Sequence, residues 1–519
     1  MPALGPNGSL RASPAGSEGT TDTFAEPIAL PAPRAPEVLF GWEDTRSDPR
    51  FGRWLVDIAP DPGAGDLPVL GAELDGQAAM ALRRLIAQGR AAGHVGVFYD
   101  NRDNGHSRLN PERFPQLTHI RYAPELIERR LHNALAGPFL FGAPVLGNAS
   151  MAVTGGRQPR SLPRLAMTTQ QGPHLAFAGY ASNHLYVYPA HHDVREVDVM
   201  PAALPYFAVS FGSSGSDQPL LNGLALALAA LQPETRTRAE AEGLLAPLLT
   251  MLLRRSLSGA PDYLSPYAHP PAIERGRVRP AVMVAAAQSI MADAIPPMVQ
   301  LRILAEDFRA SAGLAGRSER LFDTPSAVAR LWRDWAGRRT MVVSAADTVD
   351  PNGRPLEFRW AVVSGDPDRI RIEPLDPSGR AARITVDWHD APFPTTPRGR
   401  PTSRVEVAVV AWNGAHYSAP ALISIAFPGH QQRIFVEGAD GAPMLVSVDY
   451  DAEARDAAFD PVLWWSAPWT DTAIRDDDGR IIGWRRVAQD QVQILTDIAA
   501  GTHRVQAGDD GIPRLVWTP

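Results

Sequence analysis

Hydrophobic and polar positions follow different patterns in the two halves of the chain. Up to about residue 336, apolar residues recur at helical spacing in several segments, and short apolar runs lie between these segments. We expect helices at 76–92, 218–231, 235–257, 281–294, 299–308 and 324–337. Strands are expected at 94–99, 181–188 and 206–211. The mixture predicts an α+β domain over residues 37–337, with helices prominent in its second half.

Short alternating segments replace the helical pattern after about residue 338. Strands are expected at 339–344, 356–363, 369–373, 383–388, 404–412 and 421–427. Turn sequences such as Asp350-Pro351-Asn352-Gly353 separate them, and regularly spaced short strands with such turns are typical of a β-sandwich. Residues 429–519 continue the β-rich pattern. A hairpin is expected there across Asp478-Gly479, because Asp-Gly favours a two-residue turn.

One segment of this half resembles a known module. Residues 344–360 (SAADTVDPNGRPLEFRW) are similar to the opening of a PKD (polycystic-kidney-disease-type) domain, an immunoglobulin-like β-sandwich: a strand, an Asp-Pro-x-Gly turn and a strand ending in a core Trp follow one another. The closing strands within 405–427 also fit. The resemblance implies a PKD-like domain at 338–428, and such modules are usually spacers or binding appendages of extracytoplasmic proteins.

The rest of the chain resembles an uncharacterised family of bacterial exported proteins that carries the same module. The resemblance rests on the segments YDNRDNGHS, NHLYVYP and SSGSDQP. It implies architecture and an extracytoplasmic location, but no established activity.

The chain is therefore predicted to have four parts: a leader at 1–36, the α+β domain at 37–337, the PKD-like sandwich at 338–428 and a small β-rich domain at 429–519. A length of 519 residues agrees with this number. The leader is rich in Pro, Gly and Ser, which indicates disorder. It lacks the apolar stretch of a signal peptide, so we expect a cytoplasmic protein or a chain that begins after a removed signal. No apolar run reaches the ~18–20 residues of a membrane span.

Two residue types are missing from the composition. The chain has no Cys, and all 50 of its Lys and Arg residues are Arg. These absences exclude thiolate nucleophiles, disulfides, Cys-ligated zinc, Schiff-base lysines and P-loop lysines. Catalysis would depend on Ser, Thr, His, Asp, Glu, Tyr, Arg or a metal held by imidazole and carboxylate. The net charge of −7 and the lack of a basic stripe do not support a nucleic-acid partner.

The first candidate site follows the strand expected at 94–99. Its polar residues include Asp100, Arg102, Asp103 and His106. A carboxylate beside a His can orient the imidazole as a general base, and both can ligate a metal. Asn, Asp and Gly also cluster in ordinary turns, so a turn whose side chains cap backbone amides remains an alternative.

The second candidate site lies at 183–193. Alternation places His184, Tyr186 and Tyr188 on one face of a strand. The residues His191, His192 and Asp193 follow, and they offer ligands for zinc, iron or manganese. Adjacent histidines on an extended chain point to opposite sides, so a Tyr/His surface for a sugar or aromatic ligand and a structural role both remain open.

A calcium site at Asp347, Asp350 and Asn352 is a further alternative to a simple turn. The sequence requires no cofactor.

The third candidate site is a Gly/Ser turn between a strand and a helix. It contains Ser213, Ser214, Ser216 and Asp217. Unpaired amides at a helix N-terminus suit an anion, an oxyanion or a nucleophilic Ser. The turn is not a GxSxG elbow, because Ser stands in place of the second Gly. N-capping by Ser216 or Asp217 is the alternative.

These segments predict an exported hydrolase that acts on a polymer or glycan. In this hypothesis Ser214 or Ser216 is the nucleophile or anion holder, His106 or His184 is the base, and Asp100 or Asp103 orients the base. Arg102, Tyr186, Tyr188, Ser213 and Asp217 would bind the ligand. The alternative is a non-catalytic cell-surface or periplasmic protein that binds a polymer, glycan or small molecule.

Overall fold

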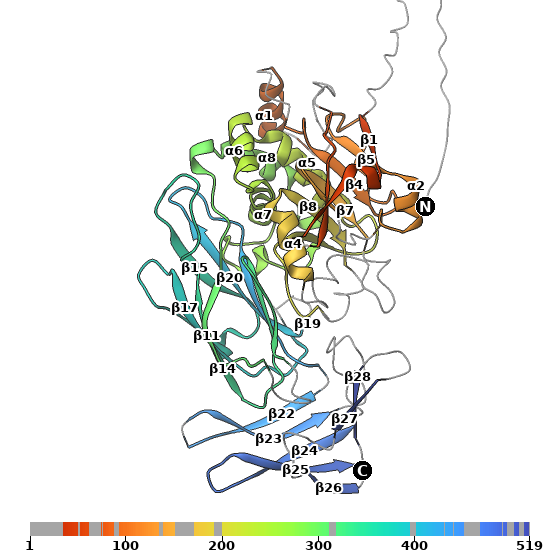
Figure 1. The fold of residues 1–519 in the computed structure, drawn as a ribbon. Coiled ribbons are helices and arrows are strands. Elements are labelled where there is room, and N and C mark those ends of the chain that lie inside the picture. Colours follow the sequence, from red (N-terminus) through yellow and green to blue (C-terminus); the bar gives the residue numbers. More distant parts are fainter. Residues whose placement is uncertain are drawn as a thin grey trace, which may run out of the picture.

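The structure, a computed structural model, describes a defined part of the chain. The described residues are 35–49, 52–61, 74, 76–87, 93–133, 139–150, 171–190, 200–310, 318–394, 401–429, 431–439, 441–450, 468–489, 491–495, 503–507 and 513–517. Within them the chain forms several sheets, with α-helices only in its N-terminal part (Figure 1).

A seven-stranded parallel sheet forms the centre of the N-terminal part. Its strands lie in the order β1 (Glu37–Phe40), β5 (Thr118–Tyr122), β4 (Phe98–Arg102), β7 (Val145–Ala149), β8 (His184–Pro189), β9 (Phe207–Phe211) and β10 (Ile273–Glu274). Every neighbouring pair is parallel. Parallel strands need crossover connections, so this part is of the α/β type and not the predicted α+β arrangement. The strands predicted at 181–188 and 206–211 are confirmed as β8 and β9, whereas β4 begins four residues later than the predicted strand at 94–99.

Helices flank this sheet because their apolar sides need a partner. They are α1 (Gly76–Ala87), α2 (Pro124–Glu128), α4 (Gly172–Ala181), α5 (Gln218–Ala230), α6 (Pro233–Ala241), α7 (Leu245–Arg255) and α8 (Pro280–Ser289). The most apolar run of the chain is α5, and it is buried from Leu220 onward except for Asn222. Helix α5 packs beside β7, α7 and α8, while α4 packs beside β8.

A small second sheet stands beside the first. It is formed by β2 (Thr45–Asp48), β3 (Arg53–Val56) and β6 (Phe139–Phe141). One side chain of this sheet, Arg53, is buried near Gly179 of α4.

The single helix predicted at 235–257 is in fact two helices, α6 and α7. Gly243 separates them, since its φ of +67° ends the helical conformation. A side chain there would also meet the carbonyl oxygen of Ala181 at 2.5 Å. Pro247 lies in the first turn of α7, where proline is tolerated, and it does not interrupt the helix.

Two antiparallel-rich sheets share one hydrophobic core in the next part of the chain. The first contains β11 (Arg302–Glu306), β14 (Arg338–Ser344), β17 (Ala381–Asp387) and β16 (Ile370–Pro374). The second contains β12 (Arg320–Thr324), β13 (Ala327–Leu331), β21 (Ala421–Ala426), β20 (Arg404–Trp412) and β15 (Glu357–Ser364). Their inner faces meet in a core that includes Met341 and Ile384 of the first sheet and Val407 and Ile423 of the second. The short strands β18 (Phe393–Pro394) and β19 (Pro401–Thr402) pair beside them.

Six predicted strands of this part are confirmed as β14 to β17, β20 and β21. The helices predicted at 299–308 and 324–337 are wrong, because β11 pairs with β14 and β13 pairs with β21. The turn at Asp350 is confirmed: the amide of Gly353 donates to the Asp350 carbonyl at 3.1 Å, and Gly353 has a φ of +68°. Trp360 lies only partly buried at the edge of the core, and its indole donates to the Gly379 carbonyl at 2.8 Å.

A five-stranded antiparallel sheet follows, formed by β22 (Gln431–Glu437), β23 (Pro443–Tyr450), β24 (Trp469–Arg475), β25 (Ile481–Ala488) and β26 (Gln491–Leu495). The predicted hairpin is confirmed between β24 and β25, but its turn is longer than two residues. The amide of Asp476 donates to the Arg480 carbonyl at 3.0 Å and Gly479 has a φ of +78°, which indicates a three-residue loop with a Gly bulge. The strands β27 (His503–Ala507) and β28 (Pro513–Trp517) form a further pair.

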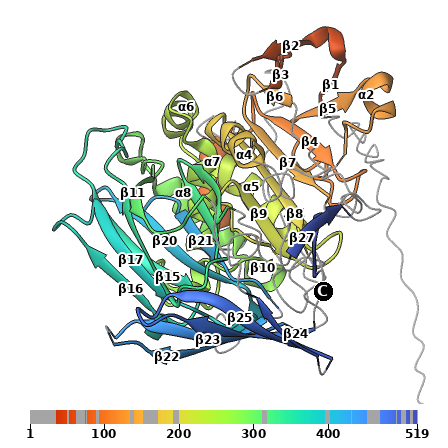
Figure 2. The same cartoon turned by 60° about the horizontal axis from the view of Figure 1, so that its bottom comes forward.

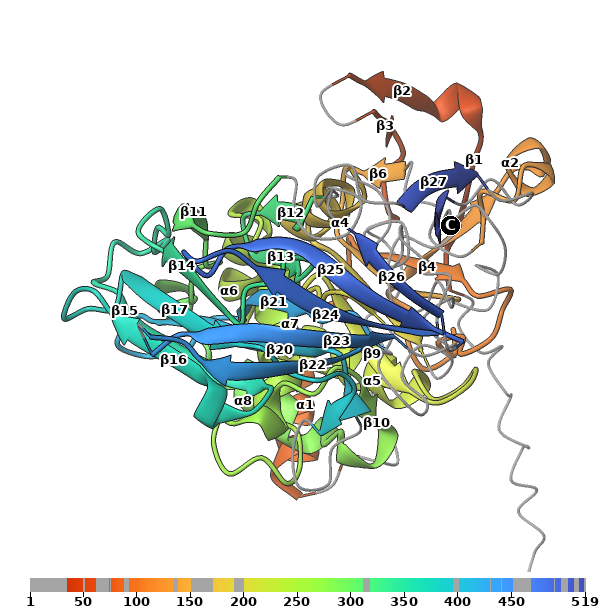
Figure 3. The same ribbon diagram turned by 90° about the horizontal axis from the view of Figure 1, so that it is seen from below.

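The three parts of the chain lie against one another. Figure 1 shows the parallel sheet and its helices at the top, the two-sheet part below them and the C-terminal sheet at the bottom. The turned view in Figure 2 keeps the helices beside the two-sheet part, and Figure 3 shows the C-terminal sheet spread across the lower side. No helix among the described residues has the length and apolar character needed to cross a membrane.

Candidate functional site

The first and third predicted segments meet at the carboxyl edge of the parallel sheet. Because the strands are parallel, β4, β7 and β9 all end at this edge. Asp103 follows β4, Ser150 follows β7, and the Gly/Ser turn at 212–217 follows β9. Loops at the carboxyl ends of such strands are where α/β proteins usually build their binding sites.

One hydroxyl group joins the two segments. The Ser107 side chain donates a hydrogen bond to Oδ1 of Asp217, although the two residues are 110 positions apart. The same Ser107 oxygen accepts a hydrogen bond of 3.1 Å from the amide of Gly215. The loop after β4 is thereby attached to the turn before α5.

Two buried carboxyl groups form the centre of the site. Asp103 is 2% exposed and Asp217 is fully buried, and Oδ2 of each has no hydrogen-bond partner among the described residues. Burial raises the pKa of both carboxyl groups, while hydrogen bonds from Ser150 to Asp103 and from Ser107 to Asp217 oppose the rise. The negative charge of Asp103 raises the pKa of Asp217 further. The charge of Asp103 is thus felt at Asp217, although burial is the larger cause of the raised pKa.

Exposed loops cover these carboxyl groups. The first loop contains His106. Asn101 of β4 and Asn148 of β7 each donate a hydrogen bond of 2.9 Å to the carbonyl oxygen of His106. The His106 ring itself is 64% exposed, and its Nδ1 lies 4.0 Å from Oδ1 of Asp103. His106 thus stands at the rim of the site, beside Asp103 and not beside a serine hydroxyl.

The second loop holds the predicted serines. Ser213 and Ser214 are exposed, whereas the Ser216 hydroxyl lies 2.8 Å from the hydroxyl of buried Ser210. Gly212, with a φ of +136°, allows this approach, since a Cβ at that position would lie 2.6 Å from the Ser216 Cβ. Asp217 is the N-cap residue that precedes α5, but its side chain makes no capping bond. Simple N-capping by Asp217 is therefore not what the structure shows.

His184 does not reach these serines. It is the first residue of β8, so it lies at the amino edge of the sheet. Its Nε2 is 3.1 Å from the Phe141 carbonyl, and burial lowers its pKa to about 4. Among the described residues, no His–Ser pair forms as the sequence predicts.

Asp100 and Arg102 belong to a separate buried network. The hydroxyl of Tyr186 donates to Oδ2 of Asp100 at 2.7 Å, and the hydroxyl of Tyr122 donates to the same carboxyl at 2.9 Å. Arg102 donates to Tyr122 at 2.7 Å and lies 3.7 Å from Asp100. Burial raises the pKa of Asp100, and the charge of Arg102 opposes the rise. Strand alternation turns Asp100 and Arg102 away from Asp103, so this network supports β4 from the other face.

The remaining predicted residues lie elsewhere. Tyr188 is buried and lines a pocket between β8 and β20. The predicted metal ligands His191, His192 and Asp193 lie outside the described residues. The part of the chain that the structure describes contains no group of three His, Asp or Glu side chains able to hold a metal ion.

The predicted calcium site at Asp350 has its oxygens occupied by protein groups. Oδ1 of Asp350 accepts the amides of Asn352 and Arg354 at 2.8 and 3.1 Å, and Oδ2 accepts the Asn413 side chain at 3.2 Å. Asp347 pairs instead with Arg302 at 3.1 Å. The contacts of Asp350 are those of a turn.

Sequence reasoning missed three contributors to the site: Ser107, Ser150 and Asn148. Ser107 was part of the first polar segment, but no local pattern shows that it reaches Asp217. Asn148 and Ser150 end a strand that was not predicted, and a polar Asn-Ala-Ser run after the apolar Val145–Leu146 pair was the available signal.

No family model matches the chain, and no curated protein matches it. Solved structures with similar regions include the following two. One is the N-terminal Ig1-2 module of the Drosophila receptor protein tyrosine phosphatase DLAR, at 12% identity and a TM-score of 0.13 over 25% of this chain; the chain spans half the length of that module. The other is a nucleoside hydrolase-related hypothetical protein from Saccharophagus degradans that is associated with carbohydrate metabolism. It is 13% identical with a TM-score of 0.19, over 55% of this chain and 71% of that one.

Proposed function

We propose that the chain is an extracytoplasmic hydrolase that cleaves glycosidic bonds of a polymer or glycan. The observation that supports the proposal is the pair of buried carboxyl groups, Asp103 and Asp217, each with an unpartnered oxygen beneath exposed loops. A carboxyl group whose pKa is raised by burial and by a like charge is suited to proton transfer near neutral pH. Keeping two such groups is costly for stability, and such costs are common at functional sites.

The two carboxyl groups take complementary roles in this proposal. Asp217, whose pKa the charge of Asp103 raises further, is the general acid. The proposal requires the covering loops to open for the substrate. Asp217 then gives its proton to the glycosidic oxygen while the bond from that oxygen to the sugar carbon breaks. Asp103, as carboxylate, accepts a proton from the water whose oxygen forms the new bond to the sugar carbon. Ser107 holds the Asp217 side chain in position through its hydrogen bond.

We further propose that the two-sheet part is an immunoglobulin-like module of the PKD type that spaces or binds the polymer. Its two sheets share one core, and its Asp-Pro-Asn-Gly turn has the expected conformation. The module would place the catalytic part on an extended substrate without contributing to the chemistry.

The proposal is tested with soluble polysaccharides and 4-nitrophenyl glycosides, by following new reducing ends or released nitrophenol. We expect hydrolysis by the wild-type chain, and a loss of about 10²–10⁴ in kcat for Asp103→Asn and for Asp217→Asn. Ser214→Ala is the matched control, because Ser214 is exposed on the same loop and is not needed for acid–base chemistry. The proposal fails if both Asn variants keep the wild-type kcat. It also fails if the wild type binds a glycan from the panel but releases no reducing ends.

A further inference from the structure

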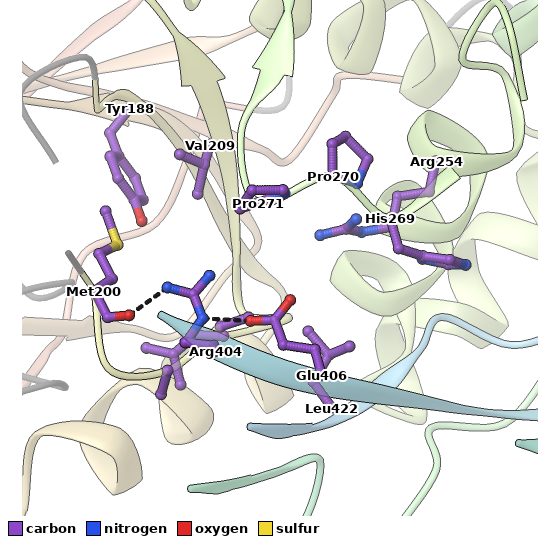
Figure 4. Close-up of a pocket in the computed structure, with 13 residues that line it drawn as sticks. Tyr188, Met200, Val209, Arg254, His269, Pro270, Pro271, Arg404, Glu406 and Leu422 are labelled. Carbon is purple, nitrogen blue, oxygen red and sulfur yellow. Dashed lines mark hydrogen bonds and ion pairs between the residues drawn. The ribbon is translucent and has the colours of Figure 1, made fainter. Parts of the chain in front are cut away.

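A small pocket lies between the parallel-sheet part and the two-sheet part. Strands β8 and β9 line it from one side through Tyr188 and Val209, and β20 lines it from the other through Arg404 and Glu406. Figure 4 shows Arg254 of α7 across the pocket from Tyr188 and Met200. Neither Asp103 nor Asp217 lines this pocket, and its chemistry is independent of the proposed hydrolase function.

The charges around this pocket do not cancel. Arg404 and Glu406 are each 2% exposed and form an ion pair of 2.6 Å, which the dashed line in Figure 4 marks. Arg404 also donates to the Met200 carbonyl. Glu406 thereby forms its ion pair with Arg404, and Arg254 is a second cation that forms no ion pair with any described residue. Together the three side chains carry a net charge of +1.

Arg254 is an unusual buried cation. The residue is 9% exposed, and its Nη1 is buried without a hydrogen-bond partner in the part of the chain that the structure describes. No carboxylate among the described residues lies within ion-pair distance of its guanidinium. Burial lowers the pKa of Arg254, and the neighbouring Tyr263 and Glu406 offset only part of that effect. A buried guanidinium normally has a partner of opposite charge, because an unpaired buried charge costs several kcal/mol.

His269 adds no second positive charge. Its Nε2 lies 2.6 Å from the Tyr263 carbonyl, so Nε2 carries the proton and donates it. Burial lowers the pKa of His269 to about 3, so the ring is neutral at physiological pH. Among the described residues that line the pocket, one positive charge therefore has no ion-pair partner.

The size of the pocket restricts what it can hold. Its volume is about 20 Å³, which is room for a species about as large as one water molecule. Leu204, Val209, Leu422 and the prolines 270 and 271 supply apolar walls. A monatomic anion is the simplest negatively charged species that matches so small a space.

We propose that this pocket binds one small monovalent anion of halide size, such as chloride, and that the Arg254 guanidinium holds it. The anion neutralises the buried charge of Arg254 at the contact between α7 and β20. It therefore stabilises the docking of the two-sheet part onto the parallel-sheet part.

The direct test is a crystal structure of the full chain in sodium bromide, with data collected at the bromine absorption edge. We expect an anomalous peak at hydrogen-bonding distance from Nη1 of Arg254. The proposal is overturned if the pocket of the wild-type protein contains no anomalous peak at a bromide concentration that fills other sites. This test needs no variant, so it stands even if substitution of Arg254 prevents folding.

Thermal unfolding supplies an independent test. At constant ionic strength, replacing gluconate by chloride should raise the wild-type Tm saturably, by about 1–2 °C at tenfold excess over Kd, since gluconate is much larger than chloride. Arg254→Met should lose this dependence on chloride. Arg255→Gln, an exposed neighbour on the same helix, should keep it. An equal chloride shift in Arg254→Met and in the wild type would show that the anion acts elsewhere, and would reject the site.

Discussion

Side-chain alternation along β4 decides which polar residues share a surface. The segment from Asp100 to Asp103 is a single polar run in the sequence, and the run alone predicts a loop site. In the structure β4 continues to Arg102, so Asp100 and Arg102 face Tyr122 and Tyr186, while Asp103 turns to the other side. The sequence could show that polar residues follow an apolar strand. It could not show which of them share a face of the sheet, because the last residue of the strand was not known. The contact of Ser107 with Asp217 depends on strand order, which no local pattern contains.

The pair of buried carboxyl groups predicts an unusual dependence of stability on pH. Burial and the charge of Asp103 raise the pKa of Asp217 in the folded chain above its value of about 3.8 in the unfolded chain. The folded state therefore binds this proton more tightly, so its stabilising contribution is present below the unfolded pKa and is lost as pH rises through the raised pKa. Asn carries no charge at any pH. The stability of Asp217→Asn relative to the wild type should hence increase as pH rises from about 3 to about 8.

Urea unfolding across this pH range measures the effect. Asp293→Asn is the control, because its side chain is 79% exposed and has little desolvation to lose. A difference between Asp217→Asn and the wild type that stays constant with pH would mean that burial does not destabilise the Asp217 carboxylate in the folded chain.

Local sequence patterns predicted strongly apolar elements correctly, and they failed for segments whose local preference is weak. Helix α5 and strands β8 and β9 were predicted correctly, because each has a run of apolar residues that differs clearly from its flanks. The segment at β11 contains Leu, Ala and Glu, which favour helices, yet it pairs with β14. Pairing with a distant strand outweighs weak local preference. The order of the parallel strands is likewise a property of distant contacts, which explains why the α/β arrangement was not predicted.

A substitution of Gly147 on β7 can show how closely neighbouring strands of the parallel sheet pack. A Cβ at this position would lie 2.5 Å from the ring of Tyr186 and 2.6 Å from the backbone oxygen of Asp100. Gly147→Ala should therefore displace Tyr186 from Asp100 and lower the free energy of unfolding by about 1–3 kcal/mol. Gly142→Ala is the matched control, since a Cβ there meets no atom within 4 Å. Urea unfolding of both variants provides the measurement, and an equal, small effect would show that β7 and β8 can shift apart without cost.

The parallel-sheet part and the two-sheet part share buried apolar residues. The core of the parallel-sheet part extends to Phe322, Ala327 and Ala329 of β12 and β13, and to Val410 of β20. Hydrogen bonds cross the same contact, for example from the Tyr263 hydroxyl to the Ser418 carbonyl at 2.9 Å. Two parts that share one core and a polar network should unfold together, in contrast to the independent modules that a spacer arrangement suggests.

The Tyr206 hydroxyl is the best point at which to test this coupling. It is buried at the contact, accepts the amide of Ser326 at 3.2 Å, and lies 2.6 Å from the Thr324 hydroxyl, which itself donates to the Ala327 carbonyl at 2.8 Å. Tyr206→Phe leaves the buried amide of Ser326 without an acceptor, which should cost about 1–3 kcal/mol. Because Tyr206 belongs to one part and its partners to the other, the loss should appear as a lower midpoint of one shared calorimetric transition.

Ser289→Ala is the control for this experiment, since it removes an exposed hydroxyl that donates to the Ala286 carbonyl at 2.7 Å. Water replaces that bond, so its loss should lie within about 0.5 kcal/mol. If Tyr206→Phe instead splits the calorimetric trace into two transitions, the parts fold independently once this contact is weakened. If the wild type already shows separate transitions for the two parts, the shared core does not couple them, and a movable two-sheet module becomes the better description of how this protein would meet an extended polymer.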